Sequence, residues 1–207
     1  MLDTTTLDLD GAQGTLLTQA AYKQDFRDRE WEIEGRDSWK LERRQHFHEA
    51  GNASWKAFIQ GDWSEALRLI ESRREALMQF SRKAEDHGVA LYRVRVVEEP
   101  LSPYVQWELN SLRVRAECGE RIRLVFPQQI APLESSGKLP ELVTLGGRTL
   151  YDIRYTASGV PDGAVRFIDP DLVESCEAVM RSLYEAGEDV ASYVEREVAH
   201  LPPPQAQ

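Results

Sequence analysis

The sequence predicts an α+β domain with a mixed sheet of roughly five strands, preceded by a helical arm and followed by a C-terminal amphipathic helix. The first observation is the run 91–97, whose residues alternate between two faces as a strand does. The second is the run 101–117, which repeats apolar residues at helical spacing and leads into another strand-like run at 121–126. Together these runs predict a β-α-β unit with parallel strands and a right-handed crossover.

Four segments are expected along the chain. Residues 1–14 are polar and rich in Thr, Asp and Gly, so we expect a flexible N-terminus. Residues 15–88 are expected to form a helical arm packed on the core, and residues 89–200 the α+β core domain. Residues 201–207 contain three successive prolines, which cannot be helical, so a free tail is expected.

The first part of the arm gives mixed signals. Its charges are dense, and Tyr22 and Phe26 stand at helical spacing, whereas Trp31 and Ile33 alternate as they would in a short strand. We expect these aromatic side chains to dock on the body of the domain. The secondary structure of this part stays open.

Two helices are predicted in the rest of the arm. The run 52–60 carries an apolar stripe and stops at Gly61, as a helix C-terminus does. Asp62 then caps a longer helix that ends near Gly88, with Glu65 in the capping-box position.

The core domain continues beyond the β-α-β unit. Residues 127–140 are expected to form a loop, followed by strands at 141–145, 149–155 and 164–168. A glycine pair, Gly146-Gly147, is typical of a tight hairpin between the first two of these strands. Asp169-Pro170 then opens the amphipathic helix, which breaks at Gly187.

Composition excludes some classes of function. The formal net charge is −10, and so acidic a surface repels phosphate backbones, so direct nucleic-acid binding is not expected. No apolar run approaches the roughly 20 residues that span a bilayer, and no positive signal-peptide segment is present, so the sequence predicts a cytoplasmic protein without membrane contact. Cys118 and Cys176 are expected to be free thiols.

Polar residues converge on the turn after the first core strand. The candidate binding site comprises Arg93, Arg95, Glu99, Ser102, Tyr104 and Glu108. The two arginines share one strand face, and Glu108 lies one helical turn from Tyr104. Guanidinium forks with carboxylates and hydroxyls suit a polar ligand, and the arginines would grip an anion or a carboxylate of a partner.

A structural interpretation of the same residues stands beside this one. Ser102 precedes Pro103 as an N-cap precedes the first residue of a helix. The arginines would then pair with neighbouring carboxylates. If the site binds a ligand, Arg95→Ala and Tyr104→Phe should abolish binding and leave the fold intact; loss of the fold would favour the structural interpretation.

Other motifs carry less chemistry. His46 and His48 are two residues apart and would point away from each other on a helix, so we predict no metal site. No G-x-S-x-G motif is present, and Cys118 is flanked by Glu117 and Glu120, which disfavour the thiolate. We therefore predict no catalytic residue, no metal and no cofactor.

The run R-V-R-V-V-E-E-P-L-S-P-Y-V-Q-W-E at 93–108 resembles the signature of an uncharacterised domain family widespread in actinobacteria. The resemblance is weaker upstream, at 39–43, and continues downstream through 116–120 to cover about 39–189. The family has no established activity, so it implies no catalytic role. Its members often occur beside helix-turn-helix regulators, which implies a regulatory association. The long N-terminal arm and the few aromatics before Arg148 depart from the family pattern.

The order of elements also resembles a half-domain of the phospholipase D fold. Catalytic members of that fold need a His-x-Lys motif, and none of the four histidines here is followed by it. The resemblance thus implies a non-catalytic version that serves in ligand sensing or association.

The sequence therefore predicts a non-enzymatic sensing or protein-interaction module, with a helix-turn-helix transcription regulator as its candidate partner and a small anionic molecule as its candidate ligand. The alternative is an enzyme that acts on a phosphate ester or small anionic metabolite, with Glu99 or Glu108 as acid and base. A deep pocket holding a carboxylate of shifted pKa would favour the enzyme. A flat aromatic surface around Trp55, Trp63 and Trp107 would favour the interaction module. The oligomeric state stays open.

Overall fold

The computed structural model describes residues 7, 9 and 11–205. The flexibility expected for residues 1–6, 8, 10, 206 and 207 lies outside the described residues. Leu7 and Leu9, from the segment expected to be flexible, pack against the core. At the other end, Nε2 of Gln106 donates a hydrogen bond to the Pro202 carbonyl over 2.8 Å, so the first proline of the tail lies against the body.

Within the described residues, eight strands form one mixed sheet in the order β1-β7-β6-β5-β2-β3-β4-β8. The strands are β1 (Thr15–Leu17), β2 (Ser38–Glu42), β3 (Leu91–Val96), β4 (Arg121–Val125), β5 (Leu142–Leu145), β6 (Thr149–Tyr155), β7 (Pro161–Phe167) and β8 (Glu188–Asp189). Strands β2, β3 and β4 are parallel neighbours, and the other pairings are antiparallel. The α+β class and the mixed sheet are confirmed.

The helices lie between and around these strands. They are α1 (Gln19–Glu30), α2 (Ala53–Ile59), α3 (Trp63–Glu71), α4 (Arg74–Asp86), α5 (Pro103–Glu117), α6 (Pro127–Ile130), α7 (Pro170–Ala186) and α8 (Val190–Tyr193), with a π-helical turn (Val194–Val198) after α8. Their caps follow the sequence: Asn52, Asp62, Ser102 and Asp169 each accept backbone N–H bonds at the N-termini of α2, α3, α5 and α7.

The prediction of five strands is wrong, and the largest error lies in the arm. Its strand β2 pairs in parallel with β3 and antiparallel with β5, so the arm supplies an interior strand of the sheet and is not purely helical. Lys40 and Glu42 of β2 are charged, which hid the strand pattern. The two other unforeseen strands, β1 and β8, pair at opposite ends of the sheet.

The single helix expected from Asp62 to Gly88 is also wrong, because the chain breaks it into α3 and α4. At the break the Arg73 N–H donates to the Ile70 carbonyl three residues back, and the Ser72 hydroxyl donates to the Leu69 carbonyl. These local bonds replace the α-helical pattern there.

The β-α-β unit is confirmed: β3 and β4 are parallel, and α5 joins them. The hairpin at Gly146-Gly147 is also confirmed, since both glycines have positive φ angles of 56° and 63° between β5 and β6. A Cβ on Gly146 would lie 2.5 Å from the Ile33 side chain, so the turn needs glycine for space as well as conformation.

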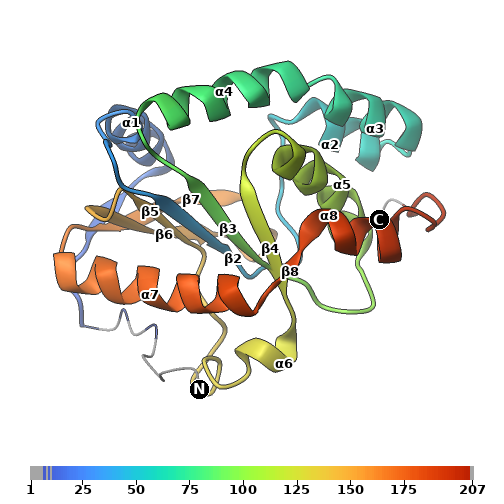
Figure 1. The fold of residues 1–207 in the computed structure, drawn as a ribbon. Helices are drawn as coiled ribbons and strands as arrows, with labels where there is room; N and C mark the ends of the chain where they lie inside the picture. Colours follow the sequence, from blue (N-terminus) through green and yellow to red (C-terminus); the bar gives the residue numbers. More distant parts are fainter. Residues whose placement is uncertain (1–6, 8, 10, 206–207) are drawn as a thin grey trace.

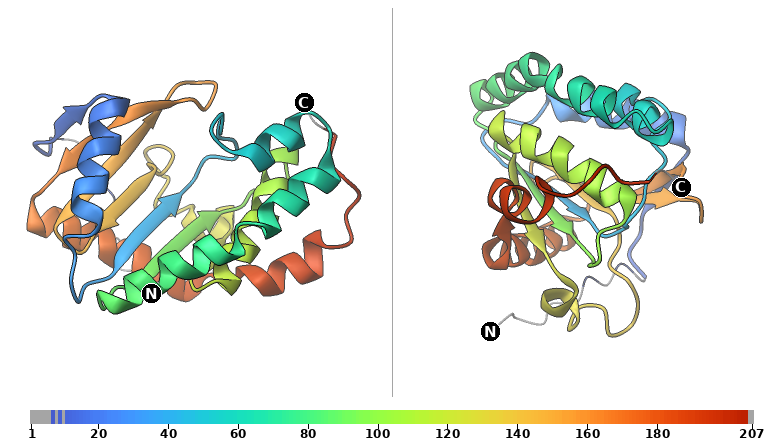
Figure 2. Two further views of the ribbon diagram at one scale, coloured as in Figure 1. Left: turned by 90° about the horizontal axis from the view of Figure 1, so that it is seen from above. Right: turned by 90° about the vertical axis from the view of Figure 1, so that its right-hand side faces the viewer.

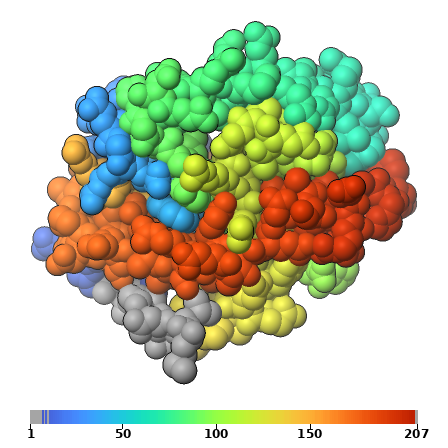
Figure 3. Space-filling view, viewed as in Figure 1, coloured from blue at the N-terminus to red at the C-terminus, as the bar shows by residue number. Residues whose placement is uncertain are grey.

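Helices cover both faces of the sheet (Figure 1). Helix α7 packs on one face, where its Met180 and Leu183 meet Leu41 of β2 and Val94 of β3. Figure 3 shows α7 and the C-terminal segment as a continuous band across that side, below α4 and α5. The opposite face carries the remaining long helices, and Figure 2 shows β2 running between α1 and α4 when the molecule is seen from above.

The two faces predicted for β3 are confirmed. Val94 and Val96 belong to the core against α7. Arg93 and Arg95 point to the opposite face, where Arg95 meets Glu108 of α5. The interior of the domain is therefore apolar on one side of β3 and ionic on the other.

Cys118 and Cys176 are both buried and free, as expected. Among the described residues, none of the helices combines the length and the apolar character that crossing a membrane takes.

Candidate functional site

A cleft lies between the helical layer and the ionic face of the sheet. It has three parts, and Lys40 of β2 lines all of them. The mouth, of about 950 Å³, is lined by Lys23 and Arg73 among others. Behind it lie a charged chamber of about 220 Å³ that contains Glu42 and Glu108, and an aromatic slot of about 230 Å³ between α1 and α4.

Glu108 on one side of the chamber is held by the buried Arg95, which does not itself line the chamber. Its Nε donates to Glu108 Oε2 over 2.8 Å, and its Nη2 lies 2.6 Å from the same oxygen without hydrogen-bond geometry. The Tyr104 hydroxyl donates to Glu49 over 2.7 Å and lies 3.3 Å from Glu108 Oε1. The guanidinium also lies 5.7 Å from the centre of the Phe47 ring. Helix α5 thus places both Tyr104 and Glu108 over β3.

The other side of the chamber is built around Arg93. Its Nη1 donates to Glu42 over 2.8 Å and its Nε donates to Glu120 over 2.7 Å. Nζ of Lys40 lies 2.6 Å from Oε1 of Glu42, and Nη1 of Arg115 lies 3.2 Å from Oε2 of Glu120. Cations and carboxylates therefore alternate along the ionic face of β2 and β3.

These neighbours shift the pKa values of the carboxyl groups in opposite directions. Burial raises the pKa of Glu108, and the nearby Arg95 only partly offsets this. Burial also acts to raise the pKa of Glu42, but the attraction of Arg93 and Lys40 outweighs burial and lowers this pKa below its usual value. Burial and the two adjacent carboxylates raise the pKa of Tyr104 well above its usual value, so its hydroxyl stays protonated and serves as a donor.

The structure brings together four of the six residues expected from the sequence: Arg93 and Glu108 line the chamber, and Arg95 and Tyr104 contact Glu108 without lining it. Glu99 lies elsewhere, exposed, and accepts a hydrogen bond of 2.8 Å from Tyr193. Ser102 accepts from the Val105 N–H over 3.2 Å and donates to the Gln45 carbonyl, so it caps α5. The arginines are paired with internal carboxylates, as the structural interpretation requires.

Sequence reasoning missed the partners of these arginines. Glu42 and Lys40 come from the unforeseen strand β2, and Glu49 comes from the loop after it. Arg73 lies at the unforeseen break between α3 and α4. The alternation of Trp39 and Leu41 with charged residues was the one available signal for β2.

A second ionic cluster closes the sheet beyond the carboxyl end of β3. Arg43 donates to Glu98 and to Glu134, each over 2.6 Å. Both oxygens of Glu141 lie 3.1 Å from the Arg43 backbone nitrogen, and one also accepts from the Arg44 N–H over 2.7 Å. In the turn that the sequence suggested as a ligand site, Glu98 is therefore held by an ion pair with Arg43.

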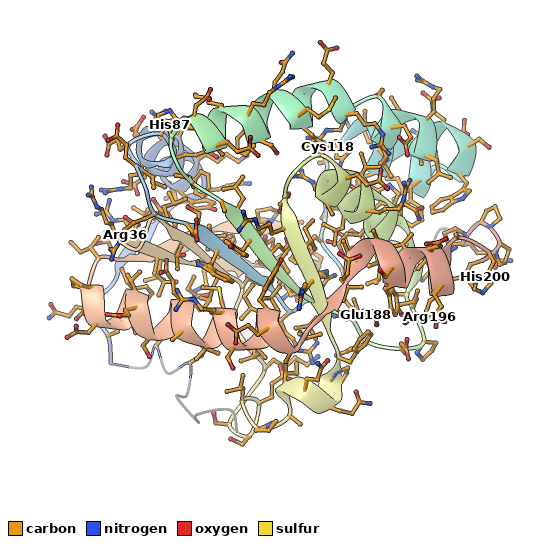
Figure 4. All side chains as sticks on the ribbon, viewed as in Figure 1. Arg36, His87, Cys118, Glu188, Arg196 and His200 are labelled. Carbon is orange, nitrogen blue, oxygen red and sulfur yellow. The ribbon has the colours of Figure 1, made fainter. Side chains whose placement is uncertain are left out.

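Groups suited to nucleophilic catalysis lie apart from one another. Figure 4 shows His87, Cys118 and His200 at separate places on the molecule. The Cys118 thiol is 3.7 Å from the Arg74 carbonyl. Within the described residues, no three His, Cys, Asp or Glu side chains are grouped so that they could hold a metal ion.

The profile of a domain of unknown function, DUF6879, matches residues 24–195. The chain belongs to this family. The match spans β2, the β-α-β unit and α7, so the ionic face lies within the DUF6879 domain, whereas Tyr22 and Lys23 of the cleft precede the matched residues. No curated protein matches the chain.

Proposed function

We propose that this DUF6879 domain is a non-enzymatic sensing module that binds a small anionic molecule in the cleft. The charge of the mouth supports this proposal. The protein carries a formal net charge of −10, yet three cations (Lys23, Lys40 and Arg73) and one carboxylate (Glu49) line the mouth. In an acidic protein, a mouth with more cations than carboxylates favours anions there.

Arg73 is the residue that we expect to hold the anion. It lines both the mouth and the chamber. Within the described part of the chain it forms no ion pair, whereas the other arginines that line the chamber, Arg93 and Arg115, are paired. Partial burial and the nearby Arg115 lower its pKa while Glu49 acts to raise it, and the charge of an incoming anion would also oppose the lowering. A guanidinium of this kind suits a carboxylate or phosphate.

The pairing inside the chamber supports a role without chemistry. Glu42 is tied to Arg93 and Lys40, and Glu108 is tied to Arg95 and Tyr104. A general base needs to reach its substrate proton directly or through one water, and these carboxylates are engaged by cations.

The ligand would be sensed on behalf of a partner. We propose a helix-turn-helix regulator as that partner, and the support for it is the family resemblance. The likeness to a phospholipase D half-domain is likewise a proposal.

Trp55 and Trp107 are buried, so they provide no flat aromatic surface on which a partner protein could dock. Ligand sensing is therefore better supported than protein interaction. Free buried thiols are usual in a reducing compartment, which supports cytoplasmic residence.

The anion site is tested by binding measurements on the whole chain. Acetate and inorganic phosphate should each raise the melting temperature, since they bind only the folded state. Arg73→Gln should weaken this binding by about tenfold or more, the effect of losing a charge-assisted pair. Arg82→Gln, on an exposed residue of α4, is the matched control and should behave as wild type. Equal anion binding by Arg73→Gln and wild type would refute the site.

One observation favours the enzyme as a second candidate function. Glu108 lies in the chamber with a raised pKa, as a general acid would. Its substrate would be a phosphate ester or small anionic metabolite. Hydrolysis of p-nitrophenyl phosphate that is lost in a folded Glu108→Gln variant would support this candidate. Anion binding without turnover would support the sensor.

A further inference from the structure

The aromatic slot of the cleft has a size and a lining that the anion site does not explain. It encloses about 230 Å³ between α1, α4 and the sheet. Its apolar walls include Tyr22, Phe26, Trp31, Ile33, Phe80 and Leu145. The slot is partly open, so these walls keep apolar surface that a ring could cover. A smaller engineered apolar cavity, on the order of 150 Å³, binds benzene.

Ring contacts hold the two walls of the slot in place. At the α4 wall, Trp31 packs edge-on against Phe80 at 5.2 Å, with the Lys83 ammonium 3.5 Å from the Trp31 ring. At the α1 wall, Tyr22 packs edge-on against Tyr151 at 5.2 Å. The slot is thus bounded by braced aromatic side chains, whose edges and faces suit another ring.

The slot opens onto the cations of the cleft. Lys40, Arg93 and Arg115 line both the slot and the chamber, and Lys40 also lines the mouth. Arg93 and Arg115 share Glu120, and Lys40 is paired with Glu42. Arg73 stands on the far side of the chamber without such a pair. Glu30 and Glu120 also line the slot, so a ligand in the slot meets paired cations there, and Arg73, at the chamber and the mouth, is a cation for which the described residues show no ion pair.

We infer that the ligand is an aromatic acid, with a compact ring system in the slot and a carboxylate directed towards Arg73 and Lys40. This inference rests on the proposed function, because it specifies the ligand of the same cleft. A long acyl chain is a poorer match, since the slot is lined by rings on both walls.

A series of probes on the wild-type chain tests the ligand class by calorimetry. Acetate supplies the anionic group alone, benzoate adds one ring, 2-naphthoate adds two, and 2-naphthamide keeps the rings without the charge. Each added ring should tighten binding by roughly tenfold or more, because it moves apolar surface out of water. The neutral amide should bind at least about tenfold more weakly than 2-naphthoate. Octanoate should bind more weakly than 2-naphthoate.

A substitution in the slot locates the ring. Leu91 is half-buried at the start of β3 and lines the slot, so Leu91→Trp should fill it. This variant should bind acetate as wild type does, but it should bind benzoate and 2-naphthoate no more tightly than acetate. Met78→Trp, on the exposed side of α4, adds the same indole elsewhere and should keep the tighter binding of benzoate and 2-naphthoate.

The outcomes separate the two proposals. If acetate, benzoate and 2-naphthoate bind equally, the anion site stands and the aromatic ligand is refuted. Octanoate binding as tight as 2-naphthoate also refutes the aromatic ligand. If none of the anions binds, the proposed function fails. The probe series on the wild-type chain decides these cases even if Leu91→Trp does not fold.

Discussion

Arg95 and Glu108 form an ion pair inside the molecule: Nη2 of Arg95 lies 2.6 Å from Oε2 of Glu108, and the Arg95 side chain has no exposed surface. Arg95 comes from β3 and Glu108 from α5, so the pair ties the sheet to the helix above it. Arg95 also donates through Nη1 to the Val96 carbonyl over 2.9 Å. The Arg95 guanidinium therefore binds groups of its own protein and offers no exposed surface to a ligand.

The first prediction concerns this pair. Arg95→Met should lower the free energy of unfolding by about 3–5 kcal/mol, because it leaves the Glu108 carboxylate buried without its cation. Urea denaturation measures the loss. The ligand-site hypothesis instead predicts that Arg95→Ala leaves the fold intact, so a loss of stability would favour the structural interpretation.

The double variant Arg95→Met/Glu108→Leu is the control. It removes both charges, so it should regain most of the stability lost by the single substitution. A double variant as unstable as Arg95→Met would mean that packing of the Arg95 stem, and not the uncompensated charge, causes the loss.

The second prediction concerns pH. Burial and the nearby Glu42 raise the pKa of Glu141 to about 7, although two backbone N–H groups partly offset this. A raised carboxyl pKa favours the protonated folded state, so this stability is fully present below the unfolded pKa, near 4.3, and is lost as the pH rises through about 7. The loss is on the order of 3 kcal/mol.

Glu141→Gln should remove this pH dependence, because the amide keeps an acceptor for the backbone and never ionises. Relative to wild type, the variant should therefore gain stability between pH 4 and pH 8. Urea denaturation across that range measures the difference. Glu174→Gln, at an exposed position of α7, should show no such gain.

Much of the fold was predictable because local chemistry and tertiary structure agree. The run 91–96 alternates as β3 does, and Ser102-Pro103 begins α5 where its cap requires. Strand β2 was not predicted, because Lys40 and Glu42 occupy buried or half-buried positions that the pattern rule assigns to apolar residues. These charges are stable there because Glu42 is paired with Lys40 on the same strand and with Arg93 on the neighbouring strand.

The candidate site was predictable only in part, for a related reason. Sequence placed Arg93 and Arg95 on one face and Glu108 one turn from Tyr104, and these spacings hold. It could not show that the arginines are already neutralised by Glu42, Glu120 and Glu108, two of which are distant in sequence from their arginine. The position of Arg73 in the cleft depends on the tertiary structure, so the sequence alone could not single it out.

The third prediction tests Ser102 as a helix cap. Ser102→Ala should lower the free energy of unfolding by about 1 kcal/mol, the usual effect of removing an N-cap acceptor. Thermal denaturation measures it, and Ser102→Thr should keep most of the stability because it retains the hydroxyl. Anion binding should be unchanged in both variants, whereas a loss of binding in folded Ser102→Ala would make Ser102 a ligand residue.

The last prediction concerns the attachment of α1, which forms one wall of the slot although none of its residues is fully buried. Asp25 holds this helix: it accepts from the Tyr151 hydroxyl over 2.7 Å and from Arg166 over 2.6 Å. Asp25→Asn should weaken the attachment by about 1 kcal/mol, since these pairs are partly exposed to solvent. Amide exchange in α1 should then be about fivefold faster.

The pH dependence of this attachment has the opposite sign to that of Glu141. Burial acts to raise the pKa of Asp25, but the Tyr151 hydrogen bond and the guanidinium groups of Arg29 and Arg166 hold it below its usual value. The stabilisation is therefore present above the unfolded pKa, near 3.9, and is lost as the pH falls through the folded value. Asp28→Asn, three residues on and exposed, is the control and should leave exchange in α1 unchanged. Equal exchange in Asp25→Asn and wild type would mean that the aromatic contacts of Tyr22 and Phe26 hold α1 without Asp25.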